Sequence, residues 1–148
     1  MANKIKLPTS GLVVIIGYAA TGKTHLMNEI KPKYKARYWS TDDYMEYGFE
    51  QALYVIMEEL RTSVAPLKVV EGVQGYRLLR KLAQLGKPLP DMVIECVASK
   101  EVRQIRIAAR GKNVQATLNL DKVLSKVYDD FKLLAPNPKY KYVRYETK

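Results

Sequence analysis

The chain has 148 residues with 47% apolar side chains, enough for one domain with a single core, and this composition excludes a disordered chain. No apolar run approaches the ~20 residues of a membrane span, and the first residues lack the apolar stretch of a secretory signal. Lysine and arginine number 25 against 15 aspartate and glutamate, and the resulting charge of +10 indicates a polyanionic partner such as a nucleic acid or nucleotide.

Strand and helix patterns alternate along the whole chain, with no linker and no repeat. Apolar runs bounded by turn residues predict strands over 12–16, 36–40, 67–71, 91–98 and 140–145. Apolar positions at helical spacing predict helices over 23–31, 48–61, 78–85, 100–110 and 120–134. This alternation is typical of an α/β protein with a parallel sheet and helices on its faces, so we expect residues 1–148 to form one domain.

Some side chains of these elements are expected in the core. The single cysteine, Cys96, lies in an apolar run, which favours a small core residue and, without an intrachain disulfide, a reducing cytoplasm. The tyrosines of segment 140–145 are expected to cover the sheet edge or the core. The last helix carries an apolar stripe at steps of three and four, formed by Leu120, Val123, Leu124, Val127, Phe131 and Leu134.

A complete G-x-x-x-x-G-K-[ST] motif lies between the first strand and the first helix, formed by Gly17, Tyr18, Ala19, Ala20, Thr21, Gly22, Lys23 and Thr24. The strand before it and the helix after it are the context that this motif requires. Backbone N–H groups of such a loop cradle phosphate oxygens, helped by the positive end of the following helix. Lys23 is expected to reach the β- and γ-phosphates, and the Thr24 hydroxyl to bind Mg²⁺. The sequence therefore predicts a nucleotide-binding site.

Two further segments carry carboxylates where a predicted strand ends. The carboxyl ends of parallel strands meet at one edge of a sheet, so both segments are expected to face the phosphate loop. Asp42 is the expected base, because phosphoryl transfer to an alcohol benefits from a carboxylate that orients the hydroxyl and accepts its proton. Asp43 and Glu71 are candidates to hold Mg²⁺ through its water ligands. The alternatives are a turn or capping pair for the aspartates and an exposed strand-end residue for Glu71.

The helix over 100–110 carries Arg103, Arg106 and Arg110 at spacings of three and four, on one face. Arginine binds phosphate oxygens with two parallel hydrogen bonds and stabilises charge on a transferring group. We expect Arg106 and Arg110 to make these contacts, although a solvated basic face is the alternative. The only histidine, His25, is expected to be structural.

These elements together resemble the P-loop kinase superfamily, which contains adenylate, uridine and polynucleotide kinases, over residues 12–110. The resemblance is carried by the phosphate loop, the Asp42-Asp43-Tyr44 element, the Glu71-Gly72 strand end and the arginine helix, which is similar to a lid. It implies a three-layer fold with a five-stranded parallel sheet in the order 2-3-1-4-5 and a short lid over about 100–117. It also implies a kinase that uses ATP with Mg²⁺ and phosphorylates a hydroxyl.

The acceptor hydroxyl is suggested by a narrower resemblance. The Asp42-Asp43-Tyr44 element is similar to the segment of polynucleotide 5′-kinases in which the first aspartate is the base, but Met45 replaces the arginine that follows there. Phage kinases that phosphorylate hydroxymethyluracil in DNA are related, so DNA modification in a host cytoplasm is one interpretation. A nucleoside or small-metabolite kinase is an alternative, as is a non-catalytic nucleic-acid-binding protein. A GTPase is disfavoured because no Asn-Lys-x-Asp segment is present.

Overall fold

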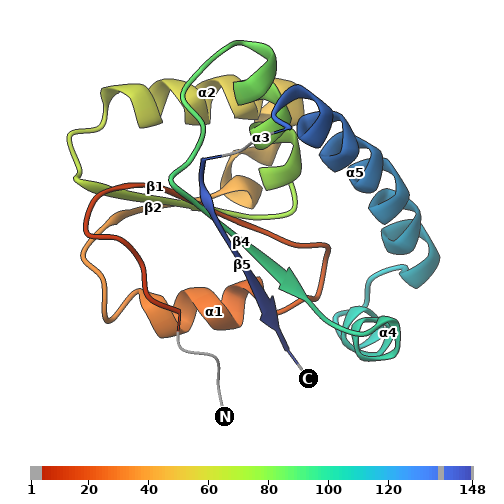
Figure 1. The fold of residues 1–148 in the computed structure, drawn as a ribbon. Helices are drawn as coiled ribbons and strands as arrows, with labels where there is room; N and C mark the ends of the chain where they lie inside the picture. The colour runs from red at the N-terminus through yellow and green to blue at the C-terminus, as the bar shows by residue number, and fades with distance from the viewer. Residues whose placement is uncertain (1–4, 137–138, 148) are drawn as a thin grey trace.

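A computed structural model describes residues 5–136 and 139–147. The chain alternates between strands and helices in the predicted order, and Figure 1 shows the helices packed around one sheet. The strands are β1 (Gly11–Ile16), β2 (Arg37–Ser40), β3 (Leu67–Glu71), β4 (Met92–Val97) and β5 (Lys141–Glu146). The helices are α1 (Lys23–Ile30), η1 (Thr41–Tyr47), α2 (Phe49–Thr62), α3 (Gly75–Gln84), α4 (Lys100–Ala109) and α5 (Val114–Leu134).

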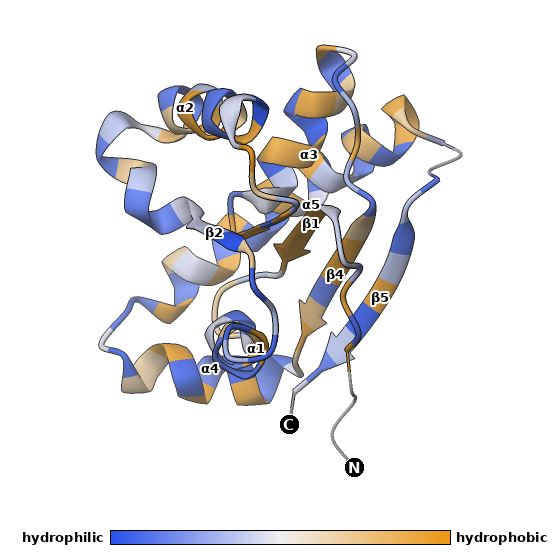
Figure 2. Cartoon of the chain, turned by 90° about the vertical axis from the view of Figure 1, so that its left-hand side faces the viewer, coloured by the Kyte–Doolittle hydropathy of each residue, from blue (hydrophilic) through white to orange (hydrophobic). Residues whose placement is uncertain are grey.

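The sheet has five parallel strands in the order β2-β3-β1-β4-β5, which confirms the predicted fold class. The strand β1 lies at the centre, where Val14 pairs in register with Val70 of β3 and Val93 of β4. These three side chains are fully buried. Both faces of a central parallel strand are covered, so β1 is apolar at nearly every position, as its hydrophobic colour in Figure 2 shows.

Helices cover both faces of the sheet and make three layers. On one face, Val13 and Ile15 of β1 pack against Leu26 and Ile30 of α1. On the other face, α2, α3 and α5 pack against the alternate strand residues, and Phe131 of α5 is fully buried there. Alternation of the strand side chains between the two faces therefore produces two cores. Among the described residues, no helix is long and apolar enough to cross a membrane.

Part of the predicted core is buried as expected, and the exceptions lie in β5 and α5. Cys96 is buried as expected, and Tyr145 of β5 is also buried, whereas Tyr142 is about half exposed. In α5 only part of the predicted stripe reaches the core, because Val123 and Leu134 are about half exposed. The residues of the stripe that face the core are Leu124, Val127 and Phe131.

The chain after β2 differs most from the sequence prediction. The segment after β2, for which the sequence analysis gives no helix or strand, is a 3-10 helix, η1, which runs over Thr41–Tyr47 directly into Gly48 and α2. Gly48 has φ 78°, a left-handed conformation that lets the chain turn between the two helices. The 3-10 helix places the first aspartate of the Asp-Asp pair at the end of β2 and directs the second elsewhere, as described below.

Candidate active site

The phosphate loop joins β1 to α1 in a conformation that requires two of its glycines. Gly22 has φ 98°, and a Cβ there would collide with the side chain of Thr147. A Cβ at Gly17 would lie 2.8 Å from the carbonyl oxygen of Cys96. Ala20 also adopts a positive φ, 63°, the only such non-glycine among the described residues. Left-handed residues alternating with right-handed ones turn successive N–H groups to one side, as an anion cradle requires.

Lys23 begins α1 and is 9% exposed. Its Nζ donates hydrogen bonds to the carbonyl oxygens of Gly17 at 3.0 Å and Tyr18 at 2.7 Å. Burial lowers the pKa of Lys23 to about 8, although the nearby Cys96, Glu71 and Asp42 groups partly restore it. The lysine therefore carries a charge that is poorly solvated and that an anionic ligand in the loop would stabilise.

A cavity of about 860 Å³ opens beside the loop and collects side chains from the carboxyl ends of several strands. Most of the predicted site residues line it, namely Ala19, Ala20, Thr21, Gly22, Lys23, Thr24, Asp42, Glu71, Arg106 and Arg110. Asp43 does not line this cavity, and neither do Gly17 and Tyr18. Tyr18 lines a second cavity of about 520 Å³ on the other side of the loop. The structure thus places Lys23 and Asp42 around one space.

Two carboxylates reach the cavity from neighbouring strand ends. Asp42 lies in the first turn of η1 and is exposed. Glu71 ends β3 and is partly buried, and burial raises its pKa, while Ser40 and the charge of Lys23 act in the opposite direction. The chain leaves β3 through Gly72, whose φ of 140° and close packing against Thr41 exclude a larger residue. A solvated carboxylate and a partly buried one thus lie beside a buried ammonium group.

Arg103 of α4 faces the protein rather than solvent. Arg103 is 6% exposed, while Ile105, on the opposite side, is 70% exposed. The sequence alternative of a solvated basic face is therefore wrong for Arg103. Arg106 lines the cavity and donates from Nη1 to the carbonyl oxygen of Ala20 at 3.1 Å. Arg110 lines the same cavity and is exposed.

Several residues of the cavity were not singled out from the sequence. Tyr145, Glu146 and Thr147 at the end of β5 form part of its wall. No motif marks them, and only the position of β5 next to β4 brings them to the loop. His25 also lines the cavity, and its Nε2 lies 3.1 Å from Oε1 of Glu29 one turn along α1. The structural role expected of His25 stays a prediction.

The oxygen donors of the cavity fit a hard divalent cation. Thr24 offers a hydroxyl and Glu71 a carboxylate beside the phosphate loop. Mg²⁺ keeps most of its water and binds proteins through one or two such groups together with substrate phosphates. Over residues 5–136 and 139–147, no three histidine, cysteine, aspartate or glutamate side chains form a metal-binding cluster. This donor set suits an ion that arrives with a nucleotide, held mainly by phosphate and water.

No protein-family model matches the sequence, and no curated protein matches it. Solved structures do resemble the fold. Shikimate kinase from Acinetobacter baumannii in complex with shikimate superimposes with a TM-score of 0.61 at 15% identity, covering 95% of this chain and 85% of that one. Deoxyadenosine kinase from M. mycoides with bound dATP gives 0.56 at 11% identity, covering 91% and 90%.

This chain shares the fold of these P-loop kinases. Identity at this level extends the likeness to the backbone architecture only, so residue roles rest on the geometry of the cavity itself. The narrower resemblance to polynucleotide kinases has no counterpart among these two neighbours, which are kinases of a small metabolite and of a nucleoside by their names.

Proposed function

We propose that this chain is a kinase that transfers the γ-phosphate of ATP to a hydroxyl group with the help of Mg²⁺. The observation that carries the proposal is the cavity that Lys23, Asp42, Glu71 and Arg106 share. The phosphate loop supplies backbone N–H groups and a lysine to a triphosphate. An aspartate on a neighbouring strand end supplies the base that a hydroxyl acceptor needs. The fold shared with known kinases supports the same reaction class.

Each group has a distinct part in this proposal. Lys23 binds the β- and γ-phosphates, and Thr24 with Glu71 holds the magnesium ion. Asp42 orients the acceptor hydroxyl and takes its proton as the oxygen attacks phosphorus. Arg106 and Arg110 stabilise negative charge on the phosphoryl group during its transfer. Asp43, which lies outside the cavity, has no part in this arrangement.

The segment 100–117 acts as the lid in this proposal. Phosphoryl transfer requires exclusion of water, since water competes with the acceptor hydroxyl. Arg106 of α4 and Arg110 directly after it line the cavity, so the lid segment carries the charge-stabilising groups.

A nucleic acid or a nucleotide is the acceptor that the charge of the chain favours. The net charge of +10 exceeds what one triphosphate requires. Exposed cations occur at the start of α4 and just after it, at Lys100, Arg110 and Lys112, and Arg110 lines the cavity. A polyanion could follow this side and place a 5′-hydroxyl or a hydroxymethyl base within reach of Asp42.

A small alcohol or a nucleoside is the second candidate, and one feature of η1 favours it. Two exposed carboxylates, Asp43 and Glu46, follow Asp42 within η1. Their charges would repel the phosphates of a long polyanion that passed along η1 to reach Asp42. A compact acceptor such as a nucleoside or a small ring alcohol avoids this repulsion, in keeping with the names of the structural neighbours.

Transfer from γ-labelled ATP separates these acceptors. The chain is offered 5′-hydroxyl oligonucleotides, DNA that contains hydroxymethyluracil, deoxynucleosides and small alcohols including shikimate. Label in an oligonucleotide assigns the first acceptor, and label in a small molecule assigns the second. DNA binding that weakens steeply with salt, without any transfer, would instead show a non-catalytic binder. If ATP neither binds nor donates phosphate to water or to any acceptor, the kinase proposal is wrong.

A further inference from the structure

The outer side of the phosphate loop is held by α4 and by the end of β5. Three consecutive carbonyl groups of the loop each accept a hydrogen bond from a side chain of these two segments. The bonds run from Arg103 Nε to Ala19 O at 2.9 Å, from Arg106 Nη1 to Ala20 O at 3.1 Å, and from Thr147 Oγ1 to Thr21 O at 2.9 Å. The loop is thus fixed from outside through its backbone.

These bonds determine where the loop N–H groups point. In a trans peptide the C=O of one residue and the N–H of the next point in opposite directions. No peptide bond in the described part of the chain is cis. Each of these carbonyls therefore directs the next N–H group, that of Ala20, Thr21 or Gly22, away from the side chain that the carbonyl contacts. These three residues line the large cavity, where a phosphate would meet the N–H groups.

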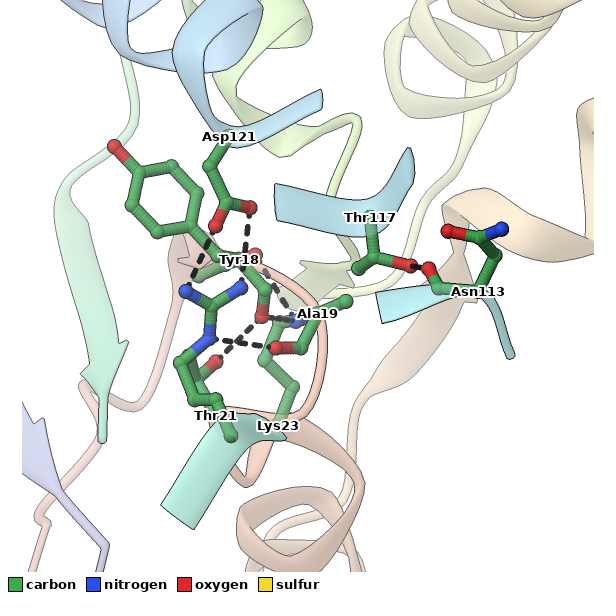
Figure 3. Close-up of polar contacts among 9 residues, drawn as sticks. Tyr18, Ala19, Thr21, Lys23, Asn113, Thr117 and Asp121 are labelled. Carbon is green, nitrogen blue, oxygen red and sulfur yellow. Dashed lines mark hydrogen bonds and ion pairs between the residues drawn. The ribbon is translucent and has the colours of Figure 1, made fainter. Parts of the chain in front are cut away.

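Arg103 is the member of this set that does not itself line the large cavity. Its guanidinium forms two bonds to Asp121 of α5, Nη1 to Oδ2 at 2.8 Å and Nη2 to Oδ1 at 3.1 Å. The side chains of the pair are 8% and 15% exposed. Figure 3 shows Asp121 directed toward the part of the loop that contains Tyr18 and Ala19. The Tyr18 ring centroid lies 5.3 Å from the guanidinium carbon.

The position of Asp121 is set within α5 itself. The helix begins at Asn113, whose side chain accepts a hydrogen bond from the N–H of Ala116 at 2.8 Å. Thr117 donates from its hydroxyl to the carbonyl oxygen of Asn113 at 2.8 Å, as Figure 3 shows. A capped first turn fixes where the helix starts. This sets the position of Asp121 along the helix axis. The guanidinium of Arg103 binds both Asp121 and the carbonyl oxygen of Ala19, so it links this position to the phosphate loop.

We propose that Arg103, oriented by Asp121, is a positioning residue that sets the N–H groups of the phosphate loop for a polyphosphate ligand. The inference rests on the proposed function only in that the loop binds phosphate. Arg103 acts through the Ala19 carbonyl and not through contact with the ligand. Because the buried pair links α5 to the loop, the loop N–H groups are already arranged for phosphate before the ligand binds. Binding then costs little reorganisation of the backbone.

Inorganic tripolyphosphate is the probe that tests this inference, because it needs the cradle but no base or acceptor. Its dissociation constant is measured by calorimetry for the full chain, for Arg103→Lys and for Asp121→Asn. Lysine cannot pair with both carboxylate oxygens and also reach Ala19, and asparagine loses the charged partner. We expect affinity to fall by about 10- to 100-fold in both variants, the range for a lost charged hydrogen bond.

Arg80→Lys is the matched control. Arg80 of α3 also pairs with a carboxylate of α5, Asp130, at 3.1 Å, but it makes no bond to the loop. If a weaker attachment of α5 alone explained the loss, this control would lose affinity too, which would overturn the inference. Amide ¹H–¹⁵N spectra supply the direct readout. The N–H signals of Ala20, Thr21 and Gly22 should shift on addition of tripolyphosphate in the wild-type chain and in Arg80→Lys, and shift far less in Asp121→Asn.

Urea unfolding of each variant shows whether it is folded before binding is compared. If Arg103→Lys does not fold, Asp121→Asn decides the matter alone, because it keeps the shape of the pair. Affinities within twofold of the wild-type value in the folded variants would overturn the role of the pair while leaving nucleotide binding intact. If the wild-type chain binds neither tripolyphosphate nor ATP, the proposed function fails, and the inference fails with it.

Discussion

The Nζ of Lys23 donates a hydrogen bond at 2.7 Å to the carbonyl oxygen of Tyr18, within the same loop that precedes its helix. A second bond, to Gly17, completes the environment of this buried ammonium group. Two neutral carbonyl oxygens replace water only in part, which is why burial lowers the pKa of Lys23. A phosphate in the cavity would offer anionic oxygens instead, so the charge state of this lysine links nucleotide binding to pH.

The first prediction concerns this pH dependence. The pKa of Lys23 is about 8 in the ligand-free chain, and bound phosphate should raise it. ATP affinity should therefore change little below pH 7 and fall by about tenfold per pH unit above pH 8. Calorimetric titrations between pH 6.5 and 9.5 measure this. Lys23→Arg stays charged over the range and should show no such fall. A wild-type affinity that stays constant to pH 9.5 would contradict the prediction.

The second prediction concerns stability without nucleotide. Because the folded-state pKa of Lys23 is depressed relative to 10.5, the charged lysine destabilises the fold below pH 8, and the penalty vanishes above pH 10.5. Lys23→Met removes this penalty but also loses two hydrogen bonds. We therefore expect the free energy of unfolding of the variant at pH 7 to be higher than that of the wild-type chain by about 1–3 kcal/mol. Urea unfolding at pH 7 measures this stability difference, and urea unfolding at pH 10 shows whether it becomes smaller. A less stable variant at pH 7 would show that the two carbonyl bonds outweigh desolvation.

The third prediction tests the base. Asp42→Asn keeps the shape of the side chain but cannot accept the proton of the acceptor. Turnover should fall by about 10²- to 10⁴-fold while the ATP dissociation constant stays within about threefold of the wild-type value. Glu46→Gln, an exposed change on the same 3-10 helix, is the control and should leave both quantities unchanged. Full turnover in Asp42→Asn would remove this aspartate from the reaction.

The fourth prediction concerns the core under α5. Phe131 is fully buried and stacks between Tyr128 and Tyr140, with ring centroids 6.2 Å from each. Phe131→Ala should lower the free energy of unfolding by about 3–5 kcal/mol, because the large cavity cannot be refilled. The nearby Leu133 is 79% exposed, and Leu133→Ala should change stability by less than about 0.5 kcal/mol. Equal effects of the two changes in urea unfolding would contradict the packing described here.

The strands and the loop were predictable because their signals are local. Buried parallel strands have apolar runs such as residues 12–16, and the phosphate loop requires glycine at Gly17 and Gly22 for reasons of backbone geometry. Helix ends at Gly86 and Gly111 follow from the same kind of signal, since both have a positive φ. The order of the strands came from the resemblance, because no local pattern states which strands are neighbours.

The parts that could not be predicted depend on contacts between distant segments. Arg103 and Arg106 look alike in the sequence, yet only Arg103 meets Asp121, eighteen positions away. Thr147 reaches the loop because β5 lies beside β4, a relationship set by the whole sheet. Asp42 and Asp43 are adjacent and chemically identical, and the turn of η1 alone decides that Asp42 faces the cavity.

Cys96 offers a practical route to test whether the segment 100–117, the proposed lid, moves. It is the only sulfhydryl of the chain, it is buried against Gly17, and burial raises its pKa to about 12, so alkylating reagents find almost no thiolate there. A second thiol introduced at the exposed Ile105 position could then be labelled selectively in the otherwise native chain. A fluorophore or spin label at that point would show whether α4 changes position when a nucleotide binds.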